Sequence, residues 1–260
     1  MLAGVRDPAA GESLLADGGT DAGGRLIPLI LDVTDAGQAA EAAERVLVEG
    51  ERLGRPGGGL DALVNNAGIG LGGPLELLAA DDLRRQFDVN VFGQVAVTQA
   101  LLPALRRAGG RIVFISSIGG RVSMAYTAPY AASKHAIEAF ADALRVELRS
   151  SGIGVALVEP GSVATPIWDK SRAEAQRVSV PEELAEHYGH VAAAMDKTMQ
   201  DTGRRGVSPE VVAETIERAL TAPRPRARYV VGRDARAMLM AKRLLPDLVF
   251  DRLVKRALGV

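Results

Sequence analysis

Short apolar runs alternate with longer amphipathic stretches along almost the whole chain, and this alternation limits the folds that the chain can adopt. The apolar runs are residues 1–5, 26–31, 61–64, 111–115, 153–158 and 228–231. The stretches with helical spacing include residues 8–16, 35–53, 81–107 and 128–150. This order is typical of a parallel sheet covered by helices. With 260 residues, the chain is predicted to form a single α/β domain, 1–260.

Local signals refine three of the predicted helical segments. Asp81 stands where a capping residue would begin the helix 81–107. Ser208, Pro209 and Glu210 have the order of a helix start, with a capping residue followed by proline in the first turn. Residues 163–206 are predicted to form a mixed helical insertion. Residues 235–258 read as one or two amphipathic helices broken at Pro246.

The composition excludes several classes of function. The 31 basic and 32 acidic residues nearly cancel and form no basic block, which argues against nucleic-acid binding. The absence of cysteine excludes disulfides, thiolate catalysis and cysteine metal sites. No apolar run is long enough to span a membrane, and the first residues do not have the pattern of a signal peptide. We therefore expect a cytoplasmic protein.

Tyr130 and Lys134 form the pair with the clearest chemical meaning. They are four residues apart in a predicted helix, so they lie on one face of it. A tyrosine with a pKa near 10 is a poor acid or base at neutral pH, but a nearby ammonium group lowers that pKa. The phenol can then exchange a proton with a carbonyl or alcohol oxygen, and the hydroxyl of Ser117 can bind the same oxygen. The alternative is an ordinary helix residue beside a solvated lysine.

Further motifs surround this pair, and together they resemble the short-chain dehydrogenase/reductase family in its compact NAD(P)-dependent branch. The matching pieces are Asp32-Val33, Asn65-Asn66-Ala67-Gly68, Asn90, Ser117, Tyr130, Lys134, and Pro160-Gly161 followed by Thr165. The resemblance implies a Rossmann-like, three-layer, doubly wound parallel sheet that lacks its first strand and helix. It also implies that the ligand lies at the carboxyl edge of that sheet.

The resemblance implies a role for each of these residues. Tyr130 would be the general acid/base, Lys134 would lower its pKa and hold the ribose, and Ser117 would orient the substrate oxygen. Asn90 would anchor a water molecule that links Lys134 to solvent. The residues implied to bind the cofactor are Arg6, Asp32, Val33, Asn65, Asn66, Ala67, Gly68, Tyr130, Lys134, Pro160, Gly161, Val163 and Thr165. For Asn65, a purely structural role in the loop is an equal alternative.

The residues after the first apolar run bear on the choice of cofactor. Family members that prefer NAD usually carry an acid there to bind the ribose 2′-hydroxyl group. Here Val5 stands in that place and Arg6 follows. An arginine can bind a 2′-phosphate with two hydrogen bonds, which favours NADP over NAD. The neighbouring Asp7 weakens this preference.

The glycine-rich segment that normally follows the first strand of the family does not occur in this sequence. A G-x-G-x-x-G match at residues 68–73 is not expected to replace it, because Pro74 follows and no acid stands at the required distance. We expect that the native start lies upstream and that Met1 is internal to the family's second strand. The missing strand is central in the family's sheet, so two strand edges would face each other unpaired.

The predicted lid and C-terminal helices bear on substrate and partners. The apolar lid residues Trp168, Tyr188, Val191, Met195 and Met199 fit a hydrophobic alcohol or carbonyl compound, although they can equally be lid packing. The segments around the pair look most like retinol- and hydroxysteroid-dehydrogenase-like members, which suggests a retinoid, steroid or lipid-like substrate. The C-terminal helices carry basic and apolar residues and can contact a membrane surface, but packing on the enzyme body is preferred. A homodimer or homotetramer is expected.

Three other readings compete with the principal one. His187 and His190 have helical spacing, but without a further ligand we expect no metal site. A non-catalytic or cofactor-deficient nucleotide-binding protein with the same fold remains the alternative function. A sugar-nucleotide epimerase shares the Tyr-x-x-x-Lys pair, but the short C-terminal region and the Asn-Asn-Ala-Gly segment argue against it.

Overall fold

The structure is a computed structural model that describes residues 1–16, 25–55, 57–165, 167–175 and 177–258. Its strands are β1 (Leu2–Val5), β2 (Ile27–Ile30), β3 (Ala62–Asn65), β4 (Arg111–Ile115), β5 (Gly154–Pro160) and β6 (Arg228–Val231). Its α-helices are α1 (Pro8–Ala16), α2 (Ala36–Arg52), α3 (Ala80–Phe87), α4 (Gln94–Ala108), α5 (Ala128–Glu147), α6 (Ile167–Ala175), α7 (Ala185–Tyr188), α8 (Val191–Arg205), α9 (Pro209–Thr221), α10 (Arg233–Leu244) and α11 (Asp247–Leu258). The predicted strand and helix alternation is confirmed.

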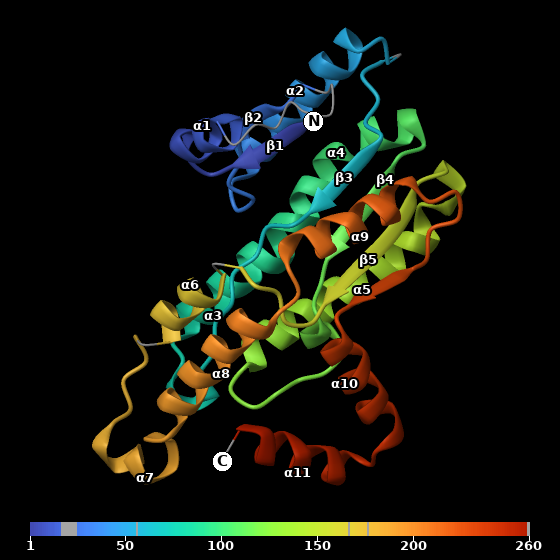
Figure 1. Ribbon diagram of the computed structural model, residues 1–260. Coiled ribbons are helices and arrows are strands. Elements are labelled where there is room, and N and C mark those ends of the chain that lie inside the picture. Colours follow the sequence, from blue (N-terminus) through green and yellow to red (C-terminus); the bar gives the residue numbers. More distant parts are fainter. Residues whose placement is uncertain (17–24, 56, 166, 176, 259–260) are drawn as a thin grey trace.

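All strand pairs are parallel, and the described strands form two sheets (Figure 1). β1 pairs with β2, and β3, β4, β5 and β6 pair in that order. Among the described residues no ladder joins β1 to β3. This arrangement matches the prediction that the sheet lacks a central strand, so that β1 and β2 do not pair with the other strands.

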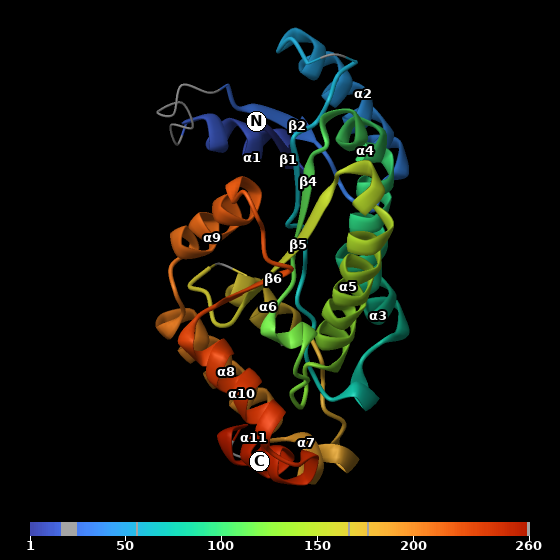
Figure 2. The ribbon, with the colours of Figure 1, turned by 90° about the vertical axis from the view of Figure 1, so that its right-hand side faces the viewer.

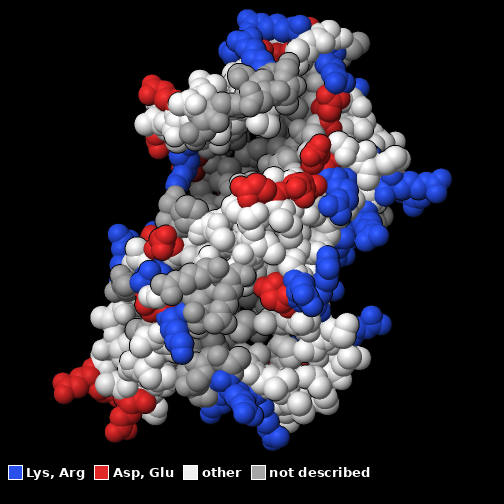
Figure 3. Space-filling model, in the orientation of Figure 1, with Lys and Arg blue, Asp and Glu red and all other residues white. Residues whose placement is uncertain are grey.

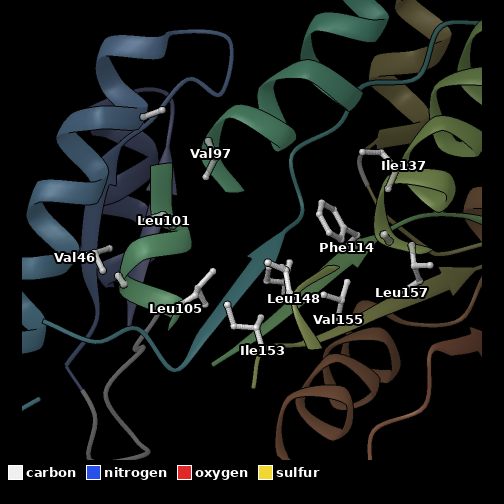
Figure 4. Packing of buried hydrophobic residues seen from close by; sticks show 14 of the residues in the cluster. Val46, Val97, Leu101, Leu105, Phe114, Ile137, Leu148, Ile153, Val155 and Leu157 are labelled. Atoms are coloured by element: carbon white, nitrogen blue, oxygen red, sulfur yellow. The ribbon is translucent and has the colours of Figure 1, made fainter. Parts of the chain in front are cut away.

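Helices cover both faces of the larger sheet, so the predicted three-layer architecture is confirmed (Figure 2). α3, α4 and α5 lie on one face, and α9 lies on the other. β4 and β5 are nearly continuous apolar runs because both of their faces are covered. The main core joins Leu105 of α4 to Phe114 of β4 and Leu157 of β5, all of them fully buried (Figure 4).

The segment predicted as one helix from Asp81 to Arg107 differs in two respects. Its cap is Ala79, which has extended backbone angles, so the prediction that Asp81 caps the helix is wrong. Asp81 lies within the first turn, where its charge meets the positive end of the helix dipole, and it pairs with Arg84 at 2.6 Å. The segment is also interrupted by a π-helical stretch, Asp88–Gly93. Such stretches are frequent at functional sites, and this one contains the buried Asn90.

The lid and the C-terminal helices gather at the carboxyl end of the larger sheet (Figure 1). The predicted lid, 163–206, contains α6, α7 and α8. The predicted break at Pro246 is confirmed, because α10 ends at Leu244 and α11 begins at Asp247. α11 contacts α8 of the lid. These helices therefore lie on the side of the molecule where the polar loops follow the strands.

Candidate active site

Ser117, Tyr130 and Lys134 converge at the carboxyl end of β4. Ser117 follows that strand, while Tyr130 and Lys134 occupy successive turns of α5, as their spacing predicts. Tyr130 shares a hydrogen bond with the Ser117 side chain. The Lys134 ammonium lies 5.9 Å from the centre of the Tyr130 ring. The structure therefore places a phenol, a hydroxyl and an amine within one small cluster.

The expected lowering of the Tyr130 pKa is not found in the protein alone. Burial raises the pKa of the phenol above 10, and the hydrogen bond with Ser117 offsets only part of that effect. The physical reason is that the Lys134 ammonium donates its hydrogen bond to the carbonyl oxygen of Ile115, at 2.8 Å, rather than to the phenol oxygen. Helical spacing placed the amine near the ring, but it did not reveal this competing acceptor.

Lys134 is itself strongly perturbed by its surroundings. Its side chain is buried, and this burial lowers the pKa of the amine from 10.5 to about 8, against the opposing effect of Glu138 one turn further along α5. At neutral pH the amine is therefore still mainly protonated. It loses its proton within a pH range in which an exposed lysine stays charged.

This perturbation predicts a titration that can be measured. In protein labelled with ¹³C at lysine Cε, we expect the Lys134 resonance to titrate with a midpoint near pH 8, with the ammonium form below it and the neutral amine above it. NMR spectra recorded from pH 6 to 11 measure the midpoint, and loss of the signal in Lys134→Arg assigns it. A midpoint at the value of an ordinary lysine, about 10.4, would contradict the burial that we describe.

Asn90 is fully buried in the π-helical stretch and binds the backbone of the loop after β3. Its Oδ1 accepts a hydrogen bond from the Ile69 amide at 2.8 Å, and its Nδ2 donates to the Ile69 carbonyl and to Ser133 Oγ, each at 3.0 Å. Gly68 lies between Asn90 and Lys134, since a Cβ there would be 3.5 Å from Asn90 Oδ1 and 3.7 Å from Lys134 Nζ. Asn90 thus joins the loop after β3 to the helix that carries Tyr130.

Two glycines that the sequence analysis did not single out flank the Tyr130 ring. A Cβ at Gly119 would lie 3.1 Å from the ring atom Cε1, and a Cβ at Gly70 would lie 4.0 Å from Cδ2. The Cβ at Gly70 would also lie 2.7 Å from the hydroxyl of the buried Ser171. The distance of these glycines from Tyr130 in the sequence does not predict the contacts, because the residues come from three separate segments of the chain.

Arg6, Asp32 and Val33 line an open cavity of 630 Å³ beside the first two strands. Ile69 and Phe92 also line this cavity. Figure 3 shows that the molecule is deeply hollowed below its upper, N-terminal part. Three of the residues that the resemblance implied to bind the cofactor are therefore brought to one cavity.

Asp7 does not share the surroundings of Arg6. Its Oδ1 accepts a hydrogen bond from the amide of Ala10 at 2.8 Å, so its carboxylate is engaged at the start of α1. The carboxylate of Asp32 binds the amide and hydroxyl groups of Thr34, mainly through the amide, and these bonds lower its pKa. The positive charge of Arg6, which lines the same cavity, also lowers the pKa of Asp32.

The other predicted cofactor residues divide into two loops. At the end of β3, the Asn65 side-chain amide donates a hydrogen bond to the Thr98 hydroxyl at 2.8 Å, so the structural alternative for this side chain has direct support. The carbonyl of Ala67 accepts a hydrogen bond from Gln94, and Asn66 is exposed. A 3₁₀ turn at Leu75–Leu77, rather than an α-helix, follows residues 68–73.

Pro160 is the last residue of β5, and Gly161, Val163 and Thr165 lie in the loop that follows it. The Gly161 amide donates to the Val231 carbonyl at 2.9 Å, and Val163 pairs with Val207. Asp234 of α10, which the sequence analysis did not identify, accepts a hydrogen bond from the Ser162 amide at 2.8 Å. A Cβ at Gly161 would lie within 2.6 Å of both carboxylate oxygens of Asp234. Any larger residue at position 161 would displace the Asp234 carboxylate, so the glycine allows this loop to approach α10 closely.

A network of ion pairs lies behind the active-site helix. The Arg228 Nε atom lies 3.0 Å from Glu138 Oε2 and 3.0 Å from Glu159 Oε1, and its Nη2 lies 2.6 Å from Asp142 Oδ2. Arg121 lies 3.2 Å from the same oxygen of Glu159, which is fully buried. Burial raises the pKa of Glu159, and the charge of Glu138 adds to this effect. Arg228 therefore compensates two buried carboxylates at once.

The described residues give no support for a metal site. No cluster of three or more histidine, aspartate or glutamate side chains was found in the ranges that the structure describes. His187 lies in α7, which ends at Tyr188, so His190 does not share its helix. The same described ranges contain no helix that is both long and apolar enough to cross a membrane.

The comparisons with known proteins agree with this geometry. Residues 2–176 match the family described as short chain dehydrogenase. The chain therefore belongs to the short-chain dehydrogenase/reductase family. It is an NAD(P)-dependent oxidoreductase of the class that acts on CH–OH groups and carbonyls.

Three similar proteins illustrate the family. An NADPH-dependent 3-dehydrocapnine reductase from Ornithobacterium rhinotracheale is 36% identical over 86% of this chain and 78% of its own. Retinol dehydrogenase 5 from Mus musculus is 37% identical over 96% of this chain and 78% of its own. A short chain dehydrogenase/reductase from Burkholderia phymatum, solved in complex with NAD, is 26% identical, with a TM-score of 0.74 over 93% of this chain and 83% of its own.

Proposed function

We propose that this protein transfers a hydride between NAD(P)(H) and a hydrophobic primary or secondary alcohol, or the matching carbonyl compound, with Tyr130 as the general acid and base. The observation that carries the proposal is the cluster of Ser117, Tyr130 and Lys134 at the carboxyl end of β4. The bound nicotinamide supplies or receives the hydride. A non-catalytic role is not favoured, because the relatives described above are named as a reductase and a dehydrogenase.

The proton is handled at the Tyr130 hydroxyl. In the direction of reduction, the phenol donates its proton to the substrate oxygen, and the Ser117 hydroxyl binds the same oxygen as charge develops on it. The raised pKa of Tyr130 keeps this proton in place before the reaction. Lys134 provides a positive charge beside the ring, which favours the phenolate after the proton has left.

A route for replacing that proton is also proposed. Asn90 and Lys134 lie on either side of Gly68, and a water molecule held beside Asn90 would carry the proton from solvent toward Lys134. In this proposal the Asn90 amide holds the loop carbonyl and amide of Ile69 that border the route. Lys134 has a pKa of about 8 and can therefore give up and regain a proton near neutral pH.

The cavity beside Arg6 fits the adenosine half of the cofactor in size, and Arg6 contributes a positive charge to its lining. Arg6 would hold a 2′-phosphate, Asp32 and Val33 would border the adenine, and the backbone of residues 65–68 would line the same side. The loop of Pro160, Gly161, Val163 and Thr165 would meet the nicotinamide carboxamide and the phosphates. Since Asp7 is already bound to Ala10, we propose that NADP is preferred to NAD.

Replacing Arg6 tests this preference directly. In Arg6→Asp, we expect the Kd for NADPH to rise by about tenfold to a hundredfold, the loss of one charge-assisted contact, while the Kd for NADH changes little. Titration of NAD(P)H fluorescence measures both constants, and Arg106→Asp at the far end of α4 is the matched control. Equal weakening of both cofactors would contradict the assignment of Arg6 to the 2′-phosphate.

The lid supports the proposal of a hydrophobic substrate. A pocket there is bordered by Val178, Val191, Met195, Pro74 and Tyr188. The side chain of Met199, which was also expected to contribute, lies outside the described residues. Reduction of a series of methyl ketones of increasing chain length tests the proposal, because kcat/KM should rise with each buried CH₂ group by up to about fourfold. A flat or falling series would overturn it.

Self-association is part of the proposal as well. The outer face of α5 exposes Phe140 and Val146, and two copies of this chain can bury these side chains against each other. We propose a homodimer or homotetramer built through this face. Light scattering on the purified protein gives the mass directly.

A further inference from the structure

The two C-terminal helices carry large apolar side chains that the described part of the chain leaves exposed. Phe250 is turned inward and is only 4% exposed, whereas Leu248 is 74% exposed. Met240 and Leu244 of α10 and Leu253 of α11 are exposed as well. The expectation that these helices pack on the enzyme body thus explains the burial of Phe250 but not the exposure of the other four side chains. We refer to these four exposed side chains, Met240, Leu244, Leu248 and Leu253, as the C-terminal face.

Positive charge is concentrated in the same two helices. Residues 233–258 contain seven basic and three acidic side chains, a net charge of +4, whereas the whole chain has a net charge of −1. The exposed cations are interleaved with the C-terminal face, among them Arg243, Arg252 and Arg256. In Figure 3, blue side chains lie among white surface along the lower edge, where Figure 1 places α10 and α11. The remaining 234 residues therefore carry a net negative charge.

This surface adjoins the lid. α11 contacts α8, and α8 contributes Val191 and Met195 to the apolar lid pocket. Asp234, at the start of α10, binds the loop after β5 through Ser162. The C-terminal face thus lies at the end of the molecule where the proposed substrate enters, rather than on a remote side.

We propose that α10 and α11 dock the enzyme on the surface of an anionic lipid bilayer, so that the lid opens toward the membrane. Leucine and methionine side chains would enter the headgroup region while arginine and lysine bind anionic headgroups. A second copy of the chain is a poorer occupant, because an isologous contact would bring two surfaces of charge +4 together. The role in substrate entry rests on the proposed function, whereas the docking itself does not.

Binding to vesicles tests the docking in the absence of cofactor and substrate. The intact protein should co-sediment with vesicles of phosphatidylglycerol and phosphatidylcholine, and at least about tenfold more weakly with phosphatidylcholine alone. Raising NaCl from 0.05 to 0.5 M should release it. Equal or absent binding to both kinds of vesicle would overturn the proposal.

Variants locate the docking surface. Arg252→Gln with Arg256→Gln should weaken binding by about 30-fold, and Leu244→Ser with Leu248→Ser by at least about tenfold. The matched controls are Arg224→Gln with Arg226→Gln in the turn before β6, and Leu53→Ser, whose side chain is 78% exposed at the end of α2. The controls should bind like the unaltered protein. If the C-terminal variants change the mass in light scattering but not vesicle binding, the face is a contact between copies and the proposal is wrong.

Activity separates this inference from the proposed function. Reduction of a short, water-soluble ketone should be unchanged in the C-terminal variants. Reduction of a long-chain ketone presented in anionic vesicles should fall with their binding. Absence of activity on both ketones, with vesicle binding retained, would contradict the proposed function alone. Loss of vesicle binding by the unaltered protein, with activity retained, would contradict the docking alone.

Discussion

Tyr130→Phe is expected to lower kcat/KM for carbonyl reduction by about 10²- to 10⁴-fold, the usual contribution of a general acid. The substitution removes one oxygen atom and leaves the ring between Gly70 and Gly119. The ring packing is therefore retained, and only the proton donor and its hydrogen bond with Ser117 are lost. Because one buried hydrogen bond contributes about 0.5–1.5 kcal/mol, the melting temperature should change little.

Tyr229→Phe is the matched control for this prediction. Its hydroxyl accepts a hydrogen bond from the Arg226 amide at 3.0 Å, in the core on the α9 side of the sheet. The same atom is deleted at a comparable cost in stability but away from Ser117, so activity should be retained. Steady-state kinetics and thermal unfolding of both variants give the comparison. Full activity in Tyr130→Phe would rule out the proposed mechanism.

Arg228→Met is expected to lower the free energy of unfolding by about 3–5 kcal/mol, the typical cost of removing one partner from buried ion pairs. The substitution leaves the carboxylates of Glu138 and Glu159 near each other without the guanidinium that lies 3.0 Å from both. Arg121 still pairs with Glu159, but Glu138 loses the guanidinium that neutralised it, and both carboxylates are buried away from water. Urea unfolding monitored by circular dichroism measures the change.

An exposed ion pair provides the contrast. Arg84→Met removes an arginine that pairs with Asp81 at 2.6 Å, but both side chains are largely exposed, and the cost should stay below about 1 kcal/mol. The double variant Arg228→Met with Glu159→Gln should recover part of the stability, because one buried charge is then absent. Similar losses for Arg84→Met and Arg228→Met would contradict the role of burial.

The sequence predicted the order of strands and helices because the residue pattern that specifies each element lies within that element. β4 and β5 are apolar runs of strand length, and α5 has the spacing of a helix with one buried face. The pairing of Tyr130 with Lys134 followed from the helical repeat alone. The capping of α3 was predicted less well, because Asp81 and Ala79 lie so close that the residue pattern did not distinguish them.

The details of the site depended on contacts between distant segments. The competing acceptor for Lys134 is Ile115, nineteen residues away, and the partner of Asn65 is Thr98, thirty-three residues away. Contacts between distant segments also place two glycines against Tyr130 and bring Asp234 to the loop after β5. They likewise decide which side chains of the C-terminal face stay exposed. None of these features follows a helical or strand period.

The sequence by itself determined the class of fold, the family and the residue types at the site, because hydrophobic period and short motifs are encoded within single elements. Only the tertiary structure decided how far those residues are buried and how their pKa values shift. Burial depends on what packs against a side chain, and it sets the pKa of Tyr130 and Lys134 in opposite directions from their ordinary values. The same packing buries Phe250 and leaves Leu248 in solvent, two residues apart in one helix.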